Sequence, residues 1–215
     1  MFPRFSNLIN SLLINIILRT KYRRKVKLSG FIWIDGELNV NLESKNKPSL
    51  LIGKGCKFLG RNDLRTRDSA NLVIGDNVKL DGPVRFVAAG QNHFIEVGDG
   101  CRFTPYSIVN GGGNISFGES SVFGPRLNIN ANKHIFGTDI RITDSGFEHV
   151  DISISENVWI GSDVNILPGS QIKANSVVGA NSVVNCAIGP NEIFAGSPAR
   201  KIGNVLQRTD SKKES

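Results

Sequence analysis

A six-residue repeat in the C-terminal half of the chain constrains the fold more than any other feature. Branched apolar residues stand six positions apart, at Ile154, Ile160, Ile166, Ile172, Val178 and Val184. A small residue follows each of the first five after four positions: Val158, Val164, Ser170, Ser176 and Ser182. Before each small residue stands one that tolerates a left-handed backbone: Asn157, Asp163, Gly169, Asn175 and Asn181. Each hexapeptide therefore predicts a short strand and a tight turn.

Six-residue periodicity is typical of a parallel β-helix, in which three hexapeptides form one triangular coil. A similar opening, an apolar residue followed by a turn and a small residue, recurs upstream. The openings stand at Ile34, in a weaker form, and at Ile52, Ile74, Val97, Phe117, Phe136, Ile154 and Ile172. We therefore predict an all-β fold of about eight stacked coils. A β-sandwich is disfavoured because its strands would alternate with a period of two.

An apolar stripe marks the N-terminal segment, FSNLINSLLINIIL at residues 5–18. Its apolar residues share one face of a helix: Leu8, Ile9, Leu12, Leu13, Ile16 and Ile17. Six cations follow within nine residues: Arg19, Lys21, Arg23, Arg24, Lys25 and Lys27. This amphipathic helix would cap the coils, packed on its own domain or on a partner subunit. Alternatively, residues 5–27 contact a membrane surface peripherally.

Composition and chain order suggest three regions. We expect the helix and basic cluster at 1–28, the β-helix at 29–190, and a C-terminal cap and charged tail at 191–215. The three cysteines form no CxxC pair, which fits a reducing compartment. The larger cationic cluster follows the apolar segment, whereas in a signal peptide it would precede it. We therefore expect a cytoplasmic protein, with the inner face of the cytoplasmic membrane as the alternative, and no nucleic-acid partner.

The stretch VWIGSDVNILPGSQIKANSVVGANSVV, followed by IFAGSPARKIG, resembles the hexapeptide-repeat acyltransferases. The similarity is greatest to the maltose, galactoside and xenobiotic acetyltransferases and to sugar O-acetyltransferases of surface-polysaccharide synthesis. It spans about residues 135–203. The resemblance implies a left-handed β-helix, a homotrimer, and acetyl-CoA bound between subunits. It also implies direct acetyl transfer, without a metal, to a sugar or lipid-linked saccharide.

A hydroxyl that attacks a thioester must lose a proton, and a histidine is suited to accept it near neutral pH. His149 lies where the similar enzymes place their base, and His134 is the second candidate. We expect a carboxylate to orient the imidazole, with Asp144 preferred to Glu148. By the same resemblance Asn128 and Asn130 would bind the acceptor.

The resemblance also implies a set of cofactor-binding residues. Trp159, Gly161 and Ser162 would lie near the thioester, with Gly161 and Ser162 offering backbone N–H groups. Gly179 and Ala180 would follow the pantetheine arm. Arg200 and Lys201 would bind the phosphates of CoA. The Thr-Lys-Asp turn common in these enzymes is replaced by Asn185, Cys186 and Ala187.

The segment ITDSGFEHVDISISENVWIG, residues 142–161, contains His149 and the acidic side chains Asp144, Glu148, Asp151 and Glu156. The openings at Phe136 and Ile154 are 18 residues apart, so we expect one full coil here. Between His149 and the WIG motif we expect almost no excursion. Strict register would bury Glu148, which is costly without a partner. A bulge would instead turn Phe147 inward and His149 outward toward a subunit cleft.

Two other functions remain open. A trimeric scaffold would keep the repeat without catalysis. A zinc enzyme like the γ-class carbonic anhydrases, which share the left-handed β-helix, would use three histidines. The chain has three, His93, His134 and His149, but their separations lack the close pair of those enzymes.

Overall fold

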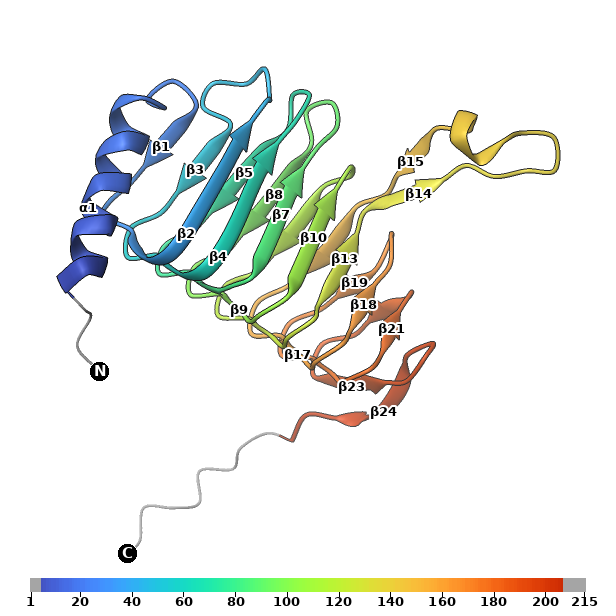
Figure 1. Cartoon of the computed structure of the whole chain (residues 1–215). Coiled ribbons are helices and arrows are strands. Elements are labelled where there is room, and N and C mark those ends of the chain that lie inside the picture. The colour runs from blue at the N-terminus through green and yellow to red at the C-terminus, as the bar shows by residue number, and fades with distance from the viewer. Residues whose placement is uncertain (1–4, 207–215) are drawn as a thin grey trace, which may run out of the picture.

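The structure, a computed structural model, describes residues 5–206 as a parallel β-helix with one α-helix at its N-terminal end (Figure 1). Strands from successive coils pair in parallel and form two large sheets. The first sheet forms one face of the coils, and the second bends around a corner to form the other two. The tail expected from Gln207 onward lies outside the described residues, as do residues 1–4.

The first face is an eight-stranded sheet with one strand from each coil. In spatial order its strands are β1 (Val26–Leu28), β3 (Leu50–Ile52), β5 (Asn71–Ile74), β8 (Phe94–Val97), β11 (Ile115–Phe117), β16 (Ile152–Ile154), β19 (Gln171–Ile172) and β22 (Ala187–Ile188).

The second and third faces share a 14-stranded sheet. The two long strands β2 (Trp33–Leu42) and β4 (Lys57–Thr66) run across both faces. The second face continues with β6 (Lys79–Asp81), β9 (Arg102–Phe103), β12 (Val122–Phe123), β17 (Trp159–Ile160), β20 (Val177–Val178) and β23 (Glu192–Ala195). The third face continues with β7 (Val84–Ala88), β10 (Ser107–Gly111), β13 (Asn128–Asn130), β18 (Asn165–Ile166) and β21 (Val183–Val184).

We expected about eight coils, but only five have a separate strand on each of the three faces in the described residues. These five start at β5, β8, β11, β16 and β19. The first two coils merge two faces into one long strand. The last coil ends on its second face, where β24 (Arg200–Asn204) pairs antiparallel with β23. Ile34 was also placed on the wrong face, because it pairs with Phe58 on the second face while Leu28 pairs with Ile52 on the first.

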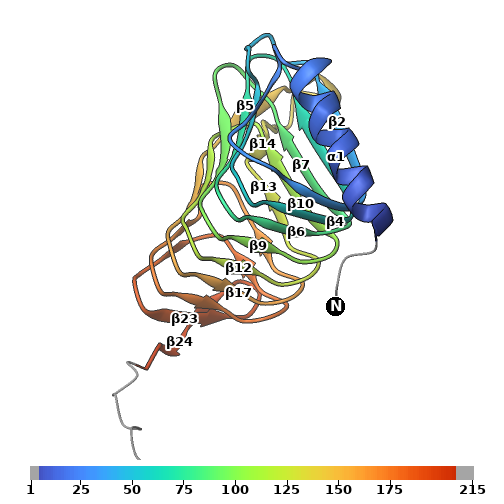
Figure 2. The same cartoon turned by 90° about the vertical axis from the view of Figure 1, so that its left-hand side faces the viewer.

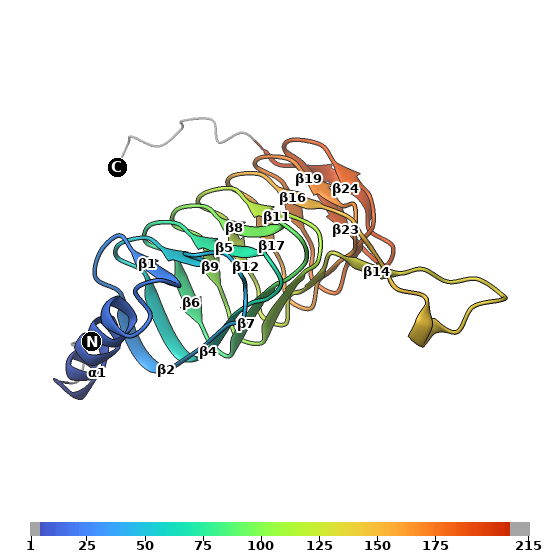
Figure 3. The same cartoon turned by 90° about the horizontal axis from the view of Figure 1, so that it is seen from above.

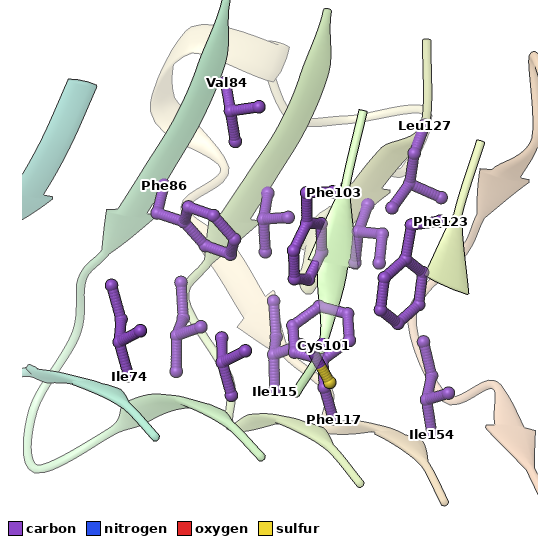
Figure 4. Packing of buried hydrophobic residues seen from close by; sticks show 14 of the residues in the cluster. Ile74, Val84, Phe86, Cys101, Phe103, Ile115, Phe117, Phe123, Leu127 and Ile154 are labelled. Atoms are coloured by element: carbon purple, nitrogen blue, oxygen red, sulfur yellow. The ribbon is translucent and has the colours of Figure 1, made fainter. Parts of the chain in front are cut away.

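The hexapeptide pattern itself is confirmed. The six branched residues from Ile154 to Val184 and the five small residues from Val158 to Ser182 are all buried. The predicted turn residues Asn157, Asp163, Gly169, Asn175 and Asn181 all have positive φ, from 54° to 86°. The core between the faces also holds a cluster of phenylalanine rings (Figure 4). Phe103 and Phe123 stack with ring centroids 4.4 Å apart, which ties neighbouring coils together.

One expected coil does not exist. Phe136 does not open a coil, because residues 132–149 leave the helix as a projecting hairpin (Figures 1 and 3). The hairpin contains β14 (Asn132–His134), the short 3₁₀ helix η1 (Ile142–Asp144) and β15 (Phe147–His149). The coil resumes at β16, which pairs directly with β11. Phe147 is therefore 53% exposed instead of inward, and the expected full coil from Phe136 is wrong. The expectation of almost no excursion between His149 and the WIG motif is confirmed, because β16 follows His149 directly and the hairpin lies before the histidine.

The helix α1 (Phe5–Thr20) lies along β2 at the open edge of the first coil (Figure 2). It docks through polar side chains. Ser11 Oγ donates to the carbonyl of Ile34 and accepts from its N–H, at 3.0 and 2.8 Å. Asn15 makes the same pair of bonds with Ile32, at 2.7 and 3.1 Å. The helix thus satisfies backbone groups that would otherwise form an unpaired strand edge.

Candidate active site

The hairpin projects from the corner between the third and first faces (Figure 3). His149 lies at its base, because it comes just before β16 in the chain. It is the last residue of β15, and its register partner in β14 is Asn132. The next residue, Val150, donates its N–H to the carbonyl of Ala131 on the coil. The histidine is therefore exposed but stands on an anchored backbone.

The imidazole of His149 contacts an amide rather than a carboxylate. Its Nδ1 is 2.9 Å from Oδ1 of Asn132. An amide oxygen only accepts hydrogen bonds, so the neutral tautomer that fits this contact has its proton on Nδ1 and its lone pair on Nε2. The arrangement needs Gly112 beneath it. A methyl group there would overlap Asn132 Oδ1 and lie 2.7 Å from His149 Nδ1.

Neither expected carboxylate takes this orienting position. Asp144 lies in η1 and accepts a hydrogen bond from its neighbour Thr143. Glu148 pairs with Lys133 across the hairpin at 3.7 Å. We had not predicted Asn132 or Gly112. The triple glycine in NGGGN, residues 110–114, was the available signal, because it marks a coil that something else approaches closely.

A second histidine adjoins the first. The rings of His93 and His149 meet edge to face, with centroids 5.5 Å apart. Nδ1 of His93 is buried and has no hydrogen-bond partner among residues 5–206. His134 instead packs on Phe147, with ring centroids 4.3 Å apart. Over the described residues, no group of three or more His, Cys, Asp or Glu side chains is arranged to hold a metal ion.

A polar cavity of about 260 Å³ opens beside this corner, beneath the hairpin. Its lining includes Arg67, Arg85, Asn110, Asn130 and Asn132 from the coils and the start of the hairpin, and His134 and Phe147 from the hairpin. His149 does not line the cavity itself and adjoins it through Asn132. Asn130 also holds the loop, since its Oδ1 accepts from the N–H of Asn132 at 3.1 Å. Asn128 does not line this cavity and donates to Asn165 at 3.1 Å.

The expected cofactor residues share a different corner, between the second and third faces. Trp159 is 59% exposed at the end of the second face. Gly161 stacks directly on the next coil, because a Cβ on it would lie 2.7 Å from the backbone nitrogen of Ala180. Gly179 stacks in turn on Ala195. Small residues thus leave the backbone open along this corner.

Only some of the N–H groups and cations expected to bind acetyl-CoA lack a partner within the described residues. The N–H of Gly161 already donates to the carbonyl of Val178 at 2.8 Å. That of Ser162 has no acceptor among residues 5–206, so it is the available donor. Lys201 Nζ is 2.7 Å from Glu192, and this bond lowers the pKa of that carboxyl. Arg200 is exposed and forms no ion pair within the described chain.

Known proteins resemble the chain in sequence and fold. Residues 151–186 match the family model "Bacterial transferase hexapeptide (six repeats)". Galactoside O-acetyltransferase of Escherichia coli is 31% identical over 136 residues, covering 63% of this chain and 65% of that protein. A proposed lipopolysaccharide biosynthesis O-acetyl transferase of the same organism is 26% identical, covering 73% of this chain and 83% of that protein.

The fold comparison extends over most of the molecule. The polysialic acid O-acetyltransferase OatWY superposes with a TM-score of 0.55 at 20% identity, covering 87% of this chain and 94% of that one. This likeness concerns the fold alone. The chain spans about half to two thirds of the first curated relatives that it matches, from 47% to 66% of their length. The six-residue repeat, the sequence similarity and the coiled fold all resemble those of the hexapeptide-repeat transferases.

Proposed function

We propose that the protein is an acetyl-CoA-dependent O-acetyltransferase acting on a sugar hydroxyl, with His149 as general base. The hydrogen bond between His149 Nδ1 and Asn132 Oδ1, at 2.9 Å, carries this proposal. It fixes the tautomer that leaves Nε2 ready to accept a proton. Asn132 takes the orienting role expected of Asp144, and it also stabilises the imidazolium that forms.

The proton balance is simple. Acetyl-CoA, when bound, supplies an acetyl group activated as a thioester. His149 Nε2 takes the proton of the acceptor hydroxyl as its oxygen bonds to the carbonyl carbon. His149 returns that proton to the sulfur when the carbon–sulfur bond breaks, so the residue ends unchanged. The free N–H of Ser162 is suited to stabilise the negative charge on the carbonyl oxygen.

The placement of these groups supports a site shared by two subunits. His149 stands between the third and first faces, whereas Gly161, Ser162 and Ala180 stand between the second and third. A whole face of the coil separates the two corners within one chain. If neighbouring chains pack side by side, the His149 corner of one chain would meet the Ser162 corner of the next. We therefore propose a homotrimer with its active sites between subunits, as cyclic symmetry allows.

The cavity beside His149 supports a saccharide acceptor. Asn110, Asn130 and Asn132 offer the amide groups that hydrogen-bond sugar hydroxyls. Arg67 and Arg85 have carboxylates only at 3.8 and 3.9 Å, so their guanidinium groups can still bind an anion. We propose an acceptor with a carboxylate or phosphate, as in a surface polysaccharide or its lipid-linked precursor, modified in the cytoplasm. The names of the relatives, which include galactoside and lipopolysaccharide transferases, agree with this class.

The first experiment measures CoA release from acetyl-CoA with matched neutral and acidic sugars. Amino sugars are included, because N-acetylation is the close variant of the reaction. We expect the wild type to acetylate acidic acceptors preferentially, and His149→Ala to lose about 10²–10⁴-fold in kcat. Full activity of His149→Ala would refute its role as base.

A binding measurement covers the case in which no sugar in the panel reacts. Calorimetry with CoA should then still show binding, because the cofactor corner does not depend on the acceptor. Absence of binding at millimolar CoA would favour the non-catalytic scaffold and contradict the proposed function. Zinc at one equivalent per subunit in the purified protein would instead favour the carbonic-anhydrase-like alternative.

A further inference from the structure

The helix α1 docks with its polar side facing the coils and leaves its apolar side outward. Ser11, Asn15 and Leu18 are buried, at 0%, 5% and 2% exposure. The apolar stripe consists of six residues, all 39–56% exposed: Leu8, Ile9, Leu12, Leu13, Ile16 and Ile17. At about 100° per residue, this stripe covers roughly half of the helix circumference, opposite the buried face. A contiguous apolar surface of this kind marks an interaction site.

The charge around the apolar stripe narrows the choice of partner. The helix contains no acidic residue, and Arg19 lies in its last turn. Five more cations, from Lys21 to Lys27, follow the helix, and none of the six forms an ion pair with a carboxylate within residues 5–206. Lys25 is engaged by the carbonyl of Ser44, while Arg23 and Arg24 are exposed. The surface therefore combines exposed apolar side chains with uncompensated positive charge.

We propose that this surface binds the anionic face of a lipid bilayer, with α1 lying in the plane of the interface. An interfacial helix buries its apolar face among the acyl chains while neighbouring Lys and Arg meet the headgroups. Spanning is excluded for this helix, because no helix in the described part of the chain is long and apolar enough to cross a bilayer. A second protein copy would bury the same stripe but would gain nothing from the adjacent cations.

The proposed trimer would strengthen the contact. Rotation about a threefold axis places three copies of α1 at the same end of the assembly. Single interfacial contacts are weak and reversible, and linked contacts bind far more tightly than one alone. The membrane proposal goes beyond the proposed function and does not depend on catalysis.

The test is flotation of the full chain with phosphatidylcholine vesicles, with and without phosphatidylglycerol. Wild type should float with the anionic vesicles and be released by high salt. Leu12→Ser/Ile16→Ser, which changes two exposed side chains, should lower binding at least about tenfold. Leu12→Met/Ile16→Met keeps the surface apolar and should bind like wild type. Arg23→Gln/Arg24→Gln should weaken binding to anionic vesicles.

Three outcomes would overturn the proposal. These are no flotation of the wild type, equal flotation of the serine variant, or a smaller assembly of the serine variant in sedimentation. The last would show that another copy of the chain covers the stripe. Thermal unfolding and acetyl transfer to a water-soluble acceptor should be unchanged in every variant. This readout separates failure of membrane binding from failure of the proposed activity.

Discussion

Replacing Asn132 tests whether His149 is oriented by an amide. In Asn132→Ala the partner of Nδ1 is removed, while the backbone pairing between β14 and β15 stays. A hydrogen bond to a neutral imidazole contributes about 1 kcal/mol, and one to an imidazolium about 1.5–3 kcal/mol. Only the difference, about 0.5–2 kcal/mol, stabilises the transition state selectively. It corresponds to about a 2- to 30-fold loss in kcat, and the exposure of His149 favours the lower end.

The assay is steady-state acetyl transfer with the best acceptor of the panel, at saturating acetyl-CoA. We expect Asn132→Ala to lower kcat and leave KM for acetyl-CoA unchanged. Asn132→Asp retains an oxygen acceptor and should recover most of the rate. In a His149→Ala background, Asn132→Ala should cause no further loss in kcat, because two residues that act through one group are not additive. Loss of the contact between Asn132 and the acceptor would instead raise the KM for the acceptor.

The double variant gives the decisive comparison. If Asn132→Ala lowers kcat by the same factor with and without His149, the amide does not act through the imidazole. The orienting role of Asn132 would then be refuted, whatever the size of the single effect. A matching loss in Asn132→Asp would point to the same conclusion.

Two further predictions concern stability and thiol reactivity. Asn15→Ala removes both hydrogen bonds to Ile32, so the free energy of local opening at the end of the first coil should fall by about 2 kcal/mol. The backbone amide of Ile32 should then exchange its hydrogen about thirtyfold faster. Unchanged exchange would contradict the capping role of α1. Burial raises the pKa of Cys56 and of Cys101 to about 11, so of the three thiols only the half-buried Cys186 should react quickly with Ellman's reagent before denaturation. Three fast equivalents in the native protein would contradict this burial.

The repeat could be predicted from the sequence because its physics is local. Each corner needs a residue that accepts positive φ, and the residue directly after that one must be small because it points into the core. The false coil at Phe136 arose because the hairpin happens to restore the 18-residue spacing. A further signal was available. The inward position is Cys56, Val78, Cys101, Ser121, Val158 or Ser176 in the true coils, all buried, whereas the false coil has Ile140, which is 43% exposed.

The orientation of α1 could not be read from hydrophobic periodicity. Periodicity identifies which side of a helix is apolar, and burial against a core usually decides which side packs. Here the surface to be covered is the edge of the first coil, where Ile32 and Ile34 present backbone N–H and C=O groups. Ser11 and Asn15 can satisfy those groups and a leucine cannot. The need to pair buried backbone groups therefore overrode the burial of the apolar side.

The hairpin places the proposed base next to the coils and its own tip away from them. Both of its ends are tied to the coils: Ala131 N–H donates to the carbonyl of Asn110 at 2.9 Å, and Asp151 accepts from the N–H and the amide of Asn114 at 2.7 and 3.1 Å. Asn132 and His149 stand just outside these anchors. The tip beyond them can change in length or sequence without moving the pair, because its strain is not transmitted past the anchored ends. In the proposed mechanism, acceptor recognition by the hairpin and the cavity beneath it can thus diverge while the proposed base keeps its geometry.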